Sequence, residues 1–529
     1  MRNEPHLARR AANFQPLSPV AFLDRALAVY PDKPAVIWHE RTWTYAGFAD
    51  IVSRMATFLK ARGVKAGDVV SVIAANRPEM LAAHYAVPML GAVLNTINTR
   101  LDVAGVAYIL NHAESRVLIA DPPCAQLACK AAAEAGVAFV ELEAEEGDFL
   151  GGDAEPLGDI FDSVSDEWQP LCVNYTSGTT GNPKGVVYHH RGAYLNAIGN
   201  VMALRLNDRS VYLWTLPMFH CNGWCHTWAV TAAGGVHVCL DRVDPADIFR
   251  ALGEHGVTHM ACAPVVLYML LNHPARARYD SSRRVLTASG GAAPSAALIS
   301  GLEALGFDFH HLYGLTESYG PVTLCEVPPE EAATLGSAEK AAQLARQGSR
   351  HATANSIRVI GDDGEELPWD GVSVGEITLR GNTLMAGYYR DAEATEKAFA
   401  DHAFHTGDLA VRFPNGEIEI RDRAKDLIIS GGENISSLEV ENALHRHPAV
   451  LLAAVVAKAD PKWGEVPCAF VELKDGETLD AEELRLFCRD HLAHYKVPKH
   501  FAFGALPRTA TGKIQKFILR ERLGTGARD

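Results

Sequence analysis

The stretch Tyr175-Thr176-Ser177-Gly178-Thr179-Thr180-Gly181-Asn182-Pro183-Lys184-Gly185 is the part of the chain from which the rest is interpreted. It follows one apolar run, Leu171–Val173, and precedes another, Gly185–Tyr188, which predicts a polar loop between two strands. Glycines let the backbone turn and expose its N–H groups, and the hydroxyls and the lysine add further donors. Such a loop suits a polyphosphate. It is not a Walker A loop, because Pro183 precedes Lys184 and Gly185 follows it.

The overall composition narrows the choice of partners and compartment. A chain of 529 residues predicts two or more domains, and the net charge of -15 without a long Lys/Arg block argues against nucleic acid. Ten scattered cysteines without a Cys-x-x-Cys pair indicate reduced thiols. Residues 1–10 lack the apolar core of a secretory signal, residues 260–271 are too short an apolar run to span a bilayer, and the last residues are not Ser-Lys-Leu. We therefore expect a cytoplasmic protein.

Hydrophobic periodicity predicts an α/β fold. Thr44 caps a helical pattern that runs from Tyr45 to Leu59, and a buried strand follows at 69–73. A helix at 80–90 and a strand at 116–120 continue the alternation, which indicates a largely parallel or mixed sheet flanked by helices. Near the end, capping pairs and two strand patterns indicate a small α+β domain. These patterns are Ser436 with Glu439, Asp480 with Glu483, and the runs 450–457 and 468–473.

Six further motifs follow the opening loop. They are Leu216–His220, Val285–Pro294, His310–Glu317, Phe404–Leu409, Arg421–Asp426 and Leu506–Ile514. Together with the loop they resemble, in order and spacing, the AMP-forming adenylating superfamily of acyl-CoA synthetases, luciferases and peptide-synthetase adenylation domains. The resemblance extends from about residue 20 to about residue 520. It implies a large N-terminal domain, residues 1–424, and a small mobile C-terminal domain, residues 425–529.

The resemblance also assigns residues to ATP and AMP. They are Thr176, Ser177, Gly178, Thr179, Thr180, Gly181, Lys184, Gly291, Ala292, His311, Tyr313, Thr316, Asp408, Arg423 and Lys513. Tyr313 offers a flat ring to adenine, and Asp408 can accept from both ribose hydroxyls. Glu317, with Thr176, is implied for the Mg²⁺ that accompanies ATP. Alone, Glu317 is more simply a surface charge, and the run 421–426 a solvated link.

The catalytic set that the resemblance implies is Lys513, Thr316, Glu317 and His220. A carboxylate must attack the α-phosphate of ATP, anion upon anion, so catalysis is mainly positioning and neutralisation of charge. Lys513 can bridge the two anions. Family members then rotate the small domain about a hinge, here Lys425, so that a thiol can enter; the turn Gly431–Gly432 is expected on the coenzyme A side.

The acyl group is expected to lie against His220, Trp224 and Gly291. We expect Trp224 and Trp228 to share one helical face because they are four residues apart. A packed core histidine is the plainer interpretation of His220. Zinc held by His220, Cys221, Cys225 and His226 is a further alternative, although this spacing fits no standard site.

The segments 13–23 and 219–224 look like the branch that holds bacterial 3-methylmercaptopropionate–CoA ligases and plant short-chain acyl-activating enzymes. Because no Arg or Lys near Trp224 could bind a second carboxylate, we expect an apolar acid, short or medium in chain or methylthio-substituted. The reaction implied is acid, ATP and coenzyme A giving acyl-CoA, AMP and diphosphate, and a homodimer is expected. The alternatives are an aryl acid such as benzoate, a stand-alone enzyme that loads a carrier protein, a luciferase, a kinase-type ATPase, and an inactive nucleotide sensor.

Overall fold

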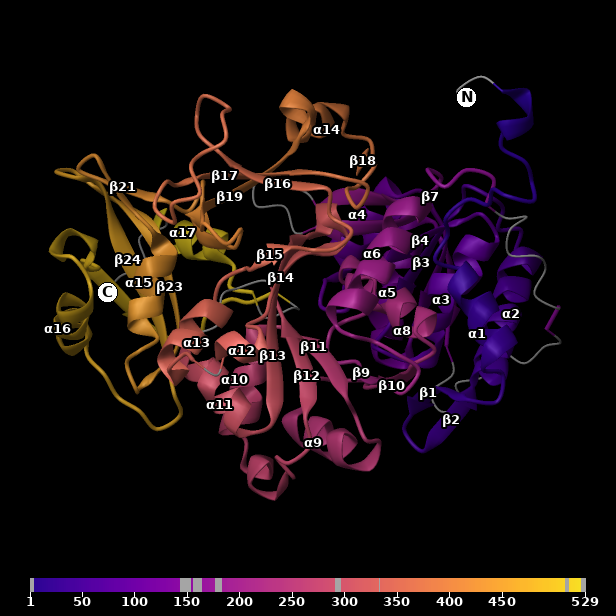
Figure 1. The fold of residues 1–529 in the computed structure, drawn as a ribbon, viewed down its shortest axis with the longest axis horizontal. Helices are drawn as coiled ribbons and strands as arrows, with labels where there is room; N and C mark the ends of the chain where they lie inside the picture. The colour runs from indigo at the N-terminus through magenta and orange to yellow at the C-terminus, as the bar shows by residue number, and fades with distance from the viewer. Residues whose placement is uncertain are drawn as a thin grey trace. The chain divides into compact units, whose positions relative to one another are not determined.

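The computed structural model of the chain describes residues 4–142, 154–155, 164–176, 183–290, 296–332, 334–509 and 513–524 (Figure 1). The chain divides into two compact units, which are described separately. Unit 1 comprises Met1–Met260, Gly314–Pro321 and Asn382–Thr395, and unit 2 comprises Ala261–Tyr313, Val322–Gly381 and Glu396–Asp529. The predicted boundary between residues 424 and 425 falls within unit 2 and stays a prediction.

A seven-stranded mixed sheet forms the centre of unit 1, as the alternating pattern predicted. Its order is β18 (Gly387–Tyr388), β8 (Lys184–His189), β7 (Pro170–Thr176), β4 (Val93–Thr96), β3 (Val69–Ile73), β5 (Ser115–Ala120) and β6 (Ala138–Glu141). From β7 to β6 all neighbours are parallel. Strands β7 and β8, and then β8 and β18, pair antiparallel, so a hairpin and a short strand complete one edge.

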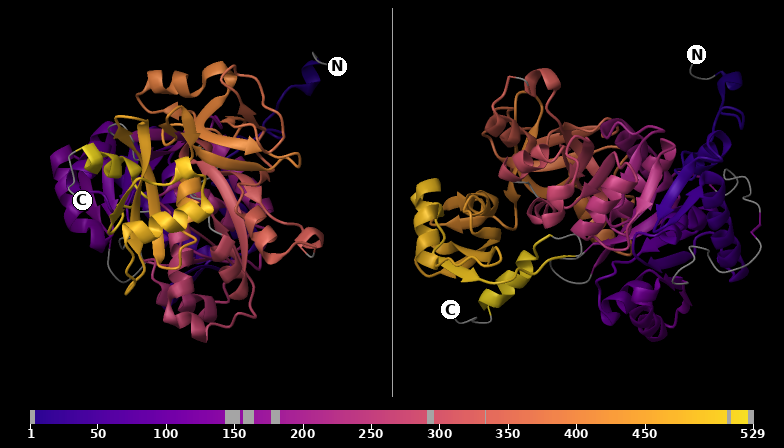
Figure 2. Two further views of the ribbon diagram at one scale, coloured as in Figure 1. Left: turned by 90° about the vertical axis from the view of Figure 1, so that its left-hand side faces the viewer. Right: turned by 90° about the horizontal axis from the view of Figure 1, so that it is seen from below.

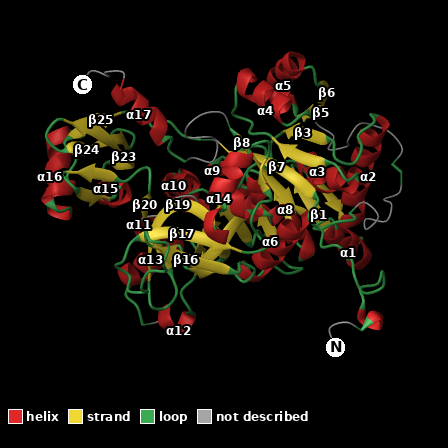
Figure 3. Ribbon diagram, turned by 90° about the horizontal axis from the view of Figure 1, so that it is seen from above, coloured by secondary structure: helices red, strands yellow, loops and turns green. Residues whose placement is uncertain are grey.

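The first long helix of unit 1 begins where the sequence predicted it. The Thr44 side chain accepts from the Gly47 N–H and caps α2 (Tyr45–Ala61), which confirms the predicted start. The next helices are α3 (Pro78–Met89), α4 (Val103–His112), α5 (Pro122–Ala135) and α6 (His190–Ala203). Residues of α4 and α5 share one buried core with β3 and β5, and Figure 3 shows both helices beside these strands. Helix α3 is buried along nearly its whole length, and its sequence accordingly has apolar residues on all faces.

Unit 1 holds a second group of strands. Strand β2 (Arg41–Thr44) pairs antiparallel with β1 (Pro34–Trp38), and β1, β10 (Val236–Cys239) and β9 (Val211–Leu213) then run parallel. His259 and Met260 continue the parallel order beside β9. The remaining helices of unit 1 are α1 (Ala21–Val29), the single turn α7 (Cys221–Trp224), α8 (His226–Ala232) and α9 (Pro245–Glu254).

Unit 2 begins with parallel strands β12 (Val285–Ser289) and β13 (Phe307–Leu315), and its helices here include α10 (Pro264–Asn272), α11 (Ala296–Ala304) and α13 (Ser337–Leu344). A four-stranded antiparallel sheet follows. Its order is β16 (Ser356–Ile360), β17 (Gly375–Arg380), β19 (Phe404–Arg412) and β20 (Ile418–Arg423). Strand β20 ends immediately before the predicted hinge.

The last part of unit 2 is the predicted α+β fold, drawn in gold and yellow in Figure 2. Its strands are β21 (Ile428–Ser430), β22 (Glu433–Ile435), β23 (Val450–Asp460), β24 (Gly464–Leu473) and β25 (His500–Phe503). Helices α15 (Ser437–Leu444) and α16 (Ala481–His491) pack on one face of β23 through Ala453 and Val455. Helix α17 (Lys516–Gly524) packs on the other face, with Ala454 and Val456, as the two-residue period of a strand requires. Within the described ranges, no helix has both the length and the apolar character needed to cross a membrane.

A buried ion pair lies at the start of α3. The Arg77 guanidinium donates to both carboxylate oxygens of Glu79, at 2.6 and 2.8 Å. Only 4% of the Arg77 side chain and 2% of the Glu79 side chain are exposed. Two charges taken out of water stabilise each other only as a pair, so removing one leaves the other buried without compensation.

The substitution Glu79→Gln should therefore destabilise unit 1 by about 3–5 kcal/mol. The exposed pair Arg54–Asp50, at 2.7 Å on α2, supplies the control. Asp50→Asn should change stability by about 0.5 kcal/mol or less because water already solvates both groups. Urea unfolding followed by circular dichroism compares the variants; equal midpoints for the two would contradict this account of the pair.

Candidate active site

Part of the predicted site lies outside the described residues: Ser177, Gly178, Thr179, Thr180, Gly181, Gly291 and Ala292. The two ends of the opening loop are described. Thr176 ends β7 and Lys184 begins β8, and the two residues face each other in the antiparallel register. The hairpin thus brings a hydroxyl and an ammonium to the same end of the sheet, as the sequence predicted.

Lys184 is surrounded by groups that unit 1 supplies from a distant part of the chain. Its Nζ lies 3.4 Å from Asp391 Oδ2 and 4.8 Å from the centre of the Tyr388 ring. Tyr388 sits on β18, which pairs with Val186 of β8. The Lys184 ammonium therefore lies beside a carboxylate and over an aromatic face. From this position it could bind an anionic ligand.

Glu317 belongs to the same cluster. The Tyr388 hydroxyl donates to Glu317 Oε1 at 2.9 Å, and the backbone N–H of Met385 donates to the Glu317 carbonyl at 2.8 Å. Burial raises the pKa of Tyr388, with the Glu317 charge as the second cause, so the phenol keeps its proton and remains a donor. The carboxylate has further lone pairs for a hard cation. Because Mg²⁺ commonly takes one or two carboxylates plus substrate phosphates, Glu317 fits that role.

Thr316 is also fixed within unit 1. The Tyr188 hydroxyl donates to its carbonyl at 2.6 Å, and its own hydroxyl lies 3.2 Å from Cys221 Sγ. Cys221 lies 3.6 Å from His220 Nε2. The structure therefore brings the predicted residues Lys184, Thr316 and Glu317 together through Tyr188 and Tyr388, with His220 reaching the group through a thiol.

The segment Cys221–Cys225 adopts a left-handed turn. All five φ values are positive, at 48°, 45°, 58°, 56° and 61°. For an L-residue other than glycine this conformation costs about 1–2 kcal/mol, and four of the five carry a Cβ. Gly223 needs to be glycine, because a Cβ there would lie 2.6 Å from the Trp214 ring.

The expectation that Trp224 and Trp228 share a helical face is therefore wrong. Trp224 belongs to the left-handed turn, and α8 begins only at His226. The Trp224 carbonyl instead accepts from Asn200 Nδ2 at 2.9 Å, and Gly320 presents its backbone to the ring, where a Cβ would lie 3.1 Å from Trp224. Trp224 is largely buried, with 9% exposed.

Two of the four side chains considered for zinc, Cys225 and His226, are directed to other partners. Cys225 Sγ lies 3.6 Å from the Tyr319 carbonyl, and His226 Nδ1 lies 2.7 Å from the Tyr212 hydroxyl. Among the described residues, no three His, Cys, Asp or Glu side chains gather as a metal site.

In unit 2, Asp408 is the centre of a second cluster. Its Oδ2 accepts from the Tyr313 hydroxyl at 2.8 Å, and its Oδ1 lies 3.0 Å from Arg423 Nε. Asp408 and Arg423 face each other across β19 and β20. Asp408 is 3% exposed, so the arginine and the phenol together compensate a nearly buried charge. Burial, followed by the Asp408 charge, raises the pKa of Tyr313, which keeps this donor protonated.

Lys513 joins the Asp408 cluster electrostatically. Lys513 is an exposed residue, yet the protein atoms around its ammonium, together with the charges of Arg423 and Lys425, lower the pKa of Lys513 to about 8. Asp408 and Asp426 act in the opposite direction. The backbone of Lys513 is held by Thr509, whose hydroxyl accepts from its N–H at 3.1 Å and whose N–H donates to its carbonyl at 2.7 Å.

The other predicted residues of unit 2 are placed as follows. His311 Nδ1 lies 2.8 Å from the Arg346 carbonyl, so one ring nitrogen is directed at the end of α13. Burial lowers the pKa of Lys425, with Arg423 as the next cause. Gly431 and Gly432 have φ values of 62° and 89° and form the tight turn between β21 and β22, a conformation that suits glycine.

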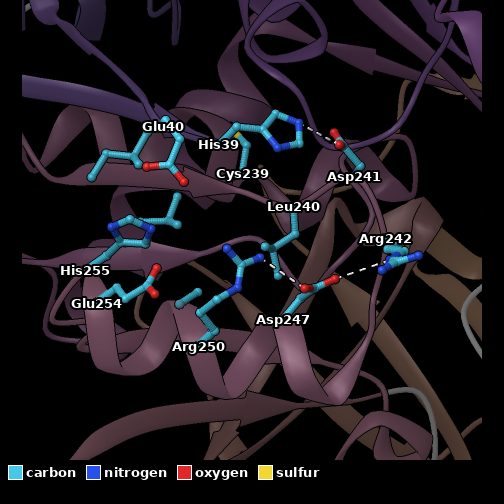
Figure 4. Close-up of a pocket in the computed structure, with 13 residues that line it drawn as sticks. His39, Glu40, Cys239, Leu240, Asp241, Arg242, Asp247, Arg250, Glu254 and His255 are labelled. Atoms are coloured by element: carbon cyan, nitrogen blue, oxygen red, sulfur yellow. Dashed lines mark hydrogen bonds and ion pairs between the residues drawn. The ribbon is translucent and has the colours of Figure 1, made fainter. Parts of the chain in front are cut away.

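A separate hollow of about 360 Å³ lies over β1, β10 and α9 of unit 1 (Figure 4). No predicted site residue lines it. Five of its side chains pair with one another: His39 Nε2 lies 2.8 Å from Asp241, and Asp247 lies 3.2 Å from Arg242 and 3.0 Å from Arg250. The chemistry that the sequence predicted is therefore not located in this hollow.

Sequence reasoning missed two residues that touch the predicted set. Tyr388 contacts Lys184 and Glu317, and its aromatic ring after Gly387 was the available signal. Asp391 offered no signal, because only the folded chain brings it to Lys184. Cys221, considered only as a zinc ligand, contacts Thr316.

Comparison with known proteins places these clusters in context. The sequence profile described as AMP-binding enzyme matches residues 23–389, and that of the AMP-binding enzyme C-terminal domain matches residues 439–513. The chain is 42% identical to an acetate/butyrate–CoA ligase from Arabidopsis thaliana, described as peroxisomal, over 98% of this chain and 97% of the relative. It is 41% identical to an acetate–CoA ligase from Humulus lupulus, with the same coverage.

Solved structures agree on the fold. An o-succinylbenzoate–CoA synthetase from Bacillus subtilis, in complex with its acyl-adenylate intermediate, superposes with a TM-score of 0.82 at 29% identity. The match covers 96% of this chain and 98% of that one.

The lowered pKa of Lys513 can be measured directly. Labelling by an amine-reactive anhydride requires the neutral amine, so the rate at Lys513, followed by mass spectrometry, should reach half its maximum near pH 8. Arg423→Gln removes a neighbouring cation and should move this midpoint upward, whereas Asp408→Asn removes an anion and should move it downward, each by about half a pH unit or more. Shifts in the same direction would show that these two charges do not control Lys513.

Proposed function

We propose, because the chain belongs to the AMP-binding enzyme family, that it joins short- or medium-chain carboxylic acids to coenzyme A with ATP, forming AMP and diphosphate. The chain is an acid–thiol ligase of the acyl-CoA synthetase type. The observation that supports the detailed proposal most is in unit 2, where the Lys513 ammonium shares its surroundings with Asp408 and Arg423.

The first step would be formation of an acyl-adenylate. A carboxylate oxygen attacks the α-phosphorus of ATP, and diphosphate leaves with the electron pair of the broken P–O bond. No general base is needed, because a carboxylic acid is already ionised at pH 7. Lys513 would lie between the two anions, Asp408 would bind the ribose hydroxyls, and Arg423 would bind ribose and phosphate.

The phosphate end of ATP would engage residues of unit 1. Lys184 supplies a cation, Glu317 a ligand for Mg²⁺, and Thr316 a hydroxyl. Bound Mg²⁺ would neutralise charge on the departing phosphates. Thr316 follows Tyr313 by three residues in the chain, just after β13 ends.

In the second step the thiolate sulfur of coenzyme A would attack the acyl carbon. The C–O bond to AMP breaks, and AMP leaves with its electron pair while the thiol proton passes to solvent. We propose that residues 425–529 turn about Lys425 to admit the thiol. Two bonds from Ser437 to Asp422, one at 3.0 Å from its hydroxyl, hold the chain on both sides of this hinge and would have to break.

The acid is proposed from the relatives and from the site. The relatives are named as ligases of acetate, butyrate and 2-methylpropanoate. Short acyl chains are therefore favoured, and 3-methylmercaptopropionate stays within the proposal as an acid of similar length. A cytoplasmic location is supported by the ten cysteines, all of which are unpaired, and a homodimer is proposed from the family alone.

A panel of acids tests the substrate class. With ATP, Mg²⁺ and coenzyme A, we expect AMP formation with acetate, butyrate, 2-methylpropanoate and 3-methylmercaptopropionate, and each methylene of chain length should change kcat/KM by about 200-fold at most. Benzoate as the best substrate would favour the aryl alternative. Release of ADP, or no carboxylate-dependent AMP with any acid, would exclude the proposed reaction.

The role of Lys513 is tested by separating the half-reactions. Lys513→Ala should slow diphosphate release about 100-fold or more, because the charge between the two anions is lost. Thioester formation from preformed acyl-adenylate should change by less than about fivefold, since no anion pair forms in that step. Lys60→Ala, at an exposed lysine, serves as the control. Equal losses in both half-reactions would remove Lys513 from the role assigned to it.

A further inference from the structure

The left-handed turn Cys221–Cys225 needs an external support. Four of its five residues have a Cβ that disfavours these angles. Strained segments of this kind persist only where the surrounding structure holds them, and they occur preferentially at functional sites. The support in unit 1 is the side chain of Asn222, at the second position of the turn.

Asn222 is bonded at both ends of its amide. Its Nδ2 lies 3.1 Å from His84 Nε2 on α3, and its Oδ1 lies 2.5 Å from Asn174 Nδ2 and 2.9 Å from Cys172 Sγ on β7. All four side chains are buried, with 2% exposure or less. The turn is thereby tied to a helix on one side and to a strand of the central sheet on the other.

One proton arrangement satisfies this network. His84 Nδ1 lies 2.7 Å from the Met80 carbonyl, which can only accept, so the ring proton is on Nδ1. Complete burial lowers the pKa of His84 to about 4, so the ring is neutral and Nε2 accepts from the Asn222 amide. The Asn222 oxygen then accepts from Asn174 and Cys172. Reversing the Asn222 amide would set its NH₂ group against the NH₂ group of Asn174. His84 Nε2 would then have no hydrogen-bond donor.

We propose that His84 and Asn222 are positioning residues that hold the left-handed turn and thereby set how far the Trp224 side chain reaches into the acyl site. This inference rests on the proposed function and on the expectation that the acyl group lies against Trp224. Trp224 is two residues from Asn222, and its carbonyl and one side of its ring are held by Asn200 and Gly320. If the turn relaxes, Trp224 cannot keep this position, because its backbone angles belong to the same turn.

The connection to β7 gives the network a second consequence. Asn174 is two residues before Thr176, where the strand ends at the opening loop. Its Oδ1 lies 3.4 Å from the Thr96 hydroxyl, which itself lies 2.9 Å from the Phe219 carbonyl just before His220. The buried polar side chains around Asn222 therefore contact the chain on both sides of His220, which is predicted to lie against the acyl group.

The test compares two substitutions at His84. His84→Phe keeps a ring but removes the acceptor, whereas His84→Gln offers an amide oxygen at a position close to that of Nε2. We expect His84→Phe to raise the KM for butyrate and to shift the ratio of kcat/KM for octanoate over butyrate by about tenfold toward octanoate. The KM for ATP should stay within about twofold, and His84→Gln should restore most of the wild-type ratio.

A matched control separates positioning from stability. His190 is also buried and neutral, and its Nδ1 bonds the Ser18 hydroxyl at 2.9 Å, away from the turn. His190→Phe should lower the melting temperature without changing the octanoate to butyrate ratio. An unchanged ratio in folded His84→Phe, or an equal shift in His84→Gln, overturns the proposal.

Asn222→Ala covers the case in which His84→Phe does not fold. Alanine keeps the Cβ that disfavours left-handed angles and loses every side-chain bond that holds the turn. The same shift in ratio is expected. A crystal structure of either variant provides a measurement that needs no turnover: residues 221–225 should leave the left-handed region and Trp224 should move, and a preserved turn overturns the proposal. If the wild-type enzyme forms no AMP with any acid, the proposed function fails, and the crystal structure still decides whether His84 holds the turn.

Discussion

The antiparallel pairing of β7 with β8 is the constraint on which the rest of unit 1 depends. It places Thr176 opposite Lys184 at the ends of the opening loop. Strand β8 pairs on its other side with β18, which brings Tyr388 to Glu317, and β7 presents Cys172 and Asn174 to Asn222. A shift of one residue in this register would turn each of these side chains to the opposite face of the sheet. One ladder of backbone hydrogen bonds therefore positions both the cluster of Lys184 and Glu317 and the left-handed turn Cys221–Cys225.

Positive charge is concentrated in one part of unit 2, although the chain as a whole is acidic. With a net charge of -15, the protein does not attract an anion by its global field. In unit 2, Arg423, Lys425 and Lys513 gather around Asp408, and their mutual repulsion contributes to the lowered pKa of Lys513. A bound phosphate would relieve this repulsion and raise that pKa, so binding an anion would itself favour the charged lysine. The free protein thus stores unfavourable electrostatic energy at the place where an anion is expected.

Local signals predicted the ordinary elements well. Thr44 begins its helix because a side-chain oxygen satisfies a free N–H, and the Asp480–Glu483 capping box is present in both directions. The predicted strands 450–457 and 468–473 proved longer, as β23 and β24, because backbone pairing continues beyond the apolar residues that defined them. The error was the helical face shared by Trp224 and Trp228. Periodicity assumes a right-handed helix, and the packing of Trp214 against Gly223, together with the bonds of Asn222, favours the opposite hand.

By itself, the sequence determined the α/β class, the order of the motifs and the kinds of functional group available, because these depend on residue type, spacing and local backbone preference. Only the tertiary structure decided which distant groups meet: Tyr388 with Glu317, Asp391 with Lys184, and His84 with Asn222. The reason is physical. A short segment carries its own propensity, but hydrogen bonds and buried charges are satisfied by whatever partner the folded chain brings within about 3 Å.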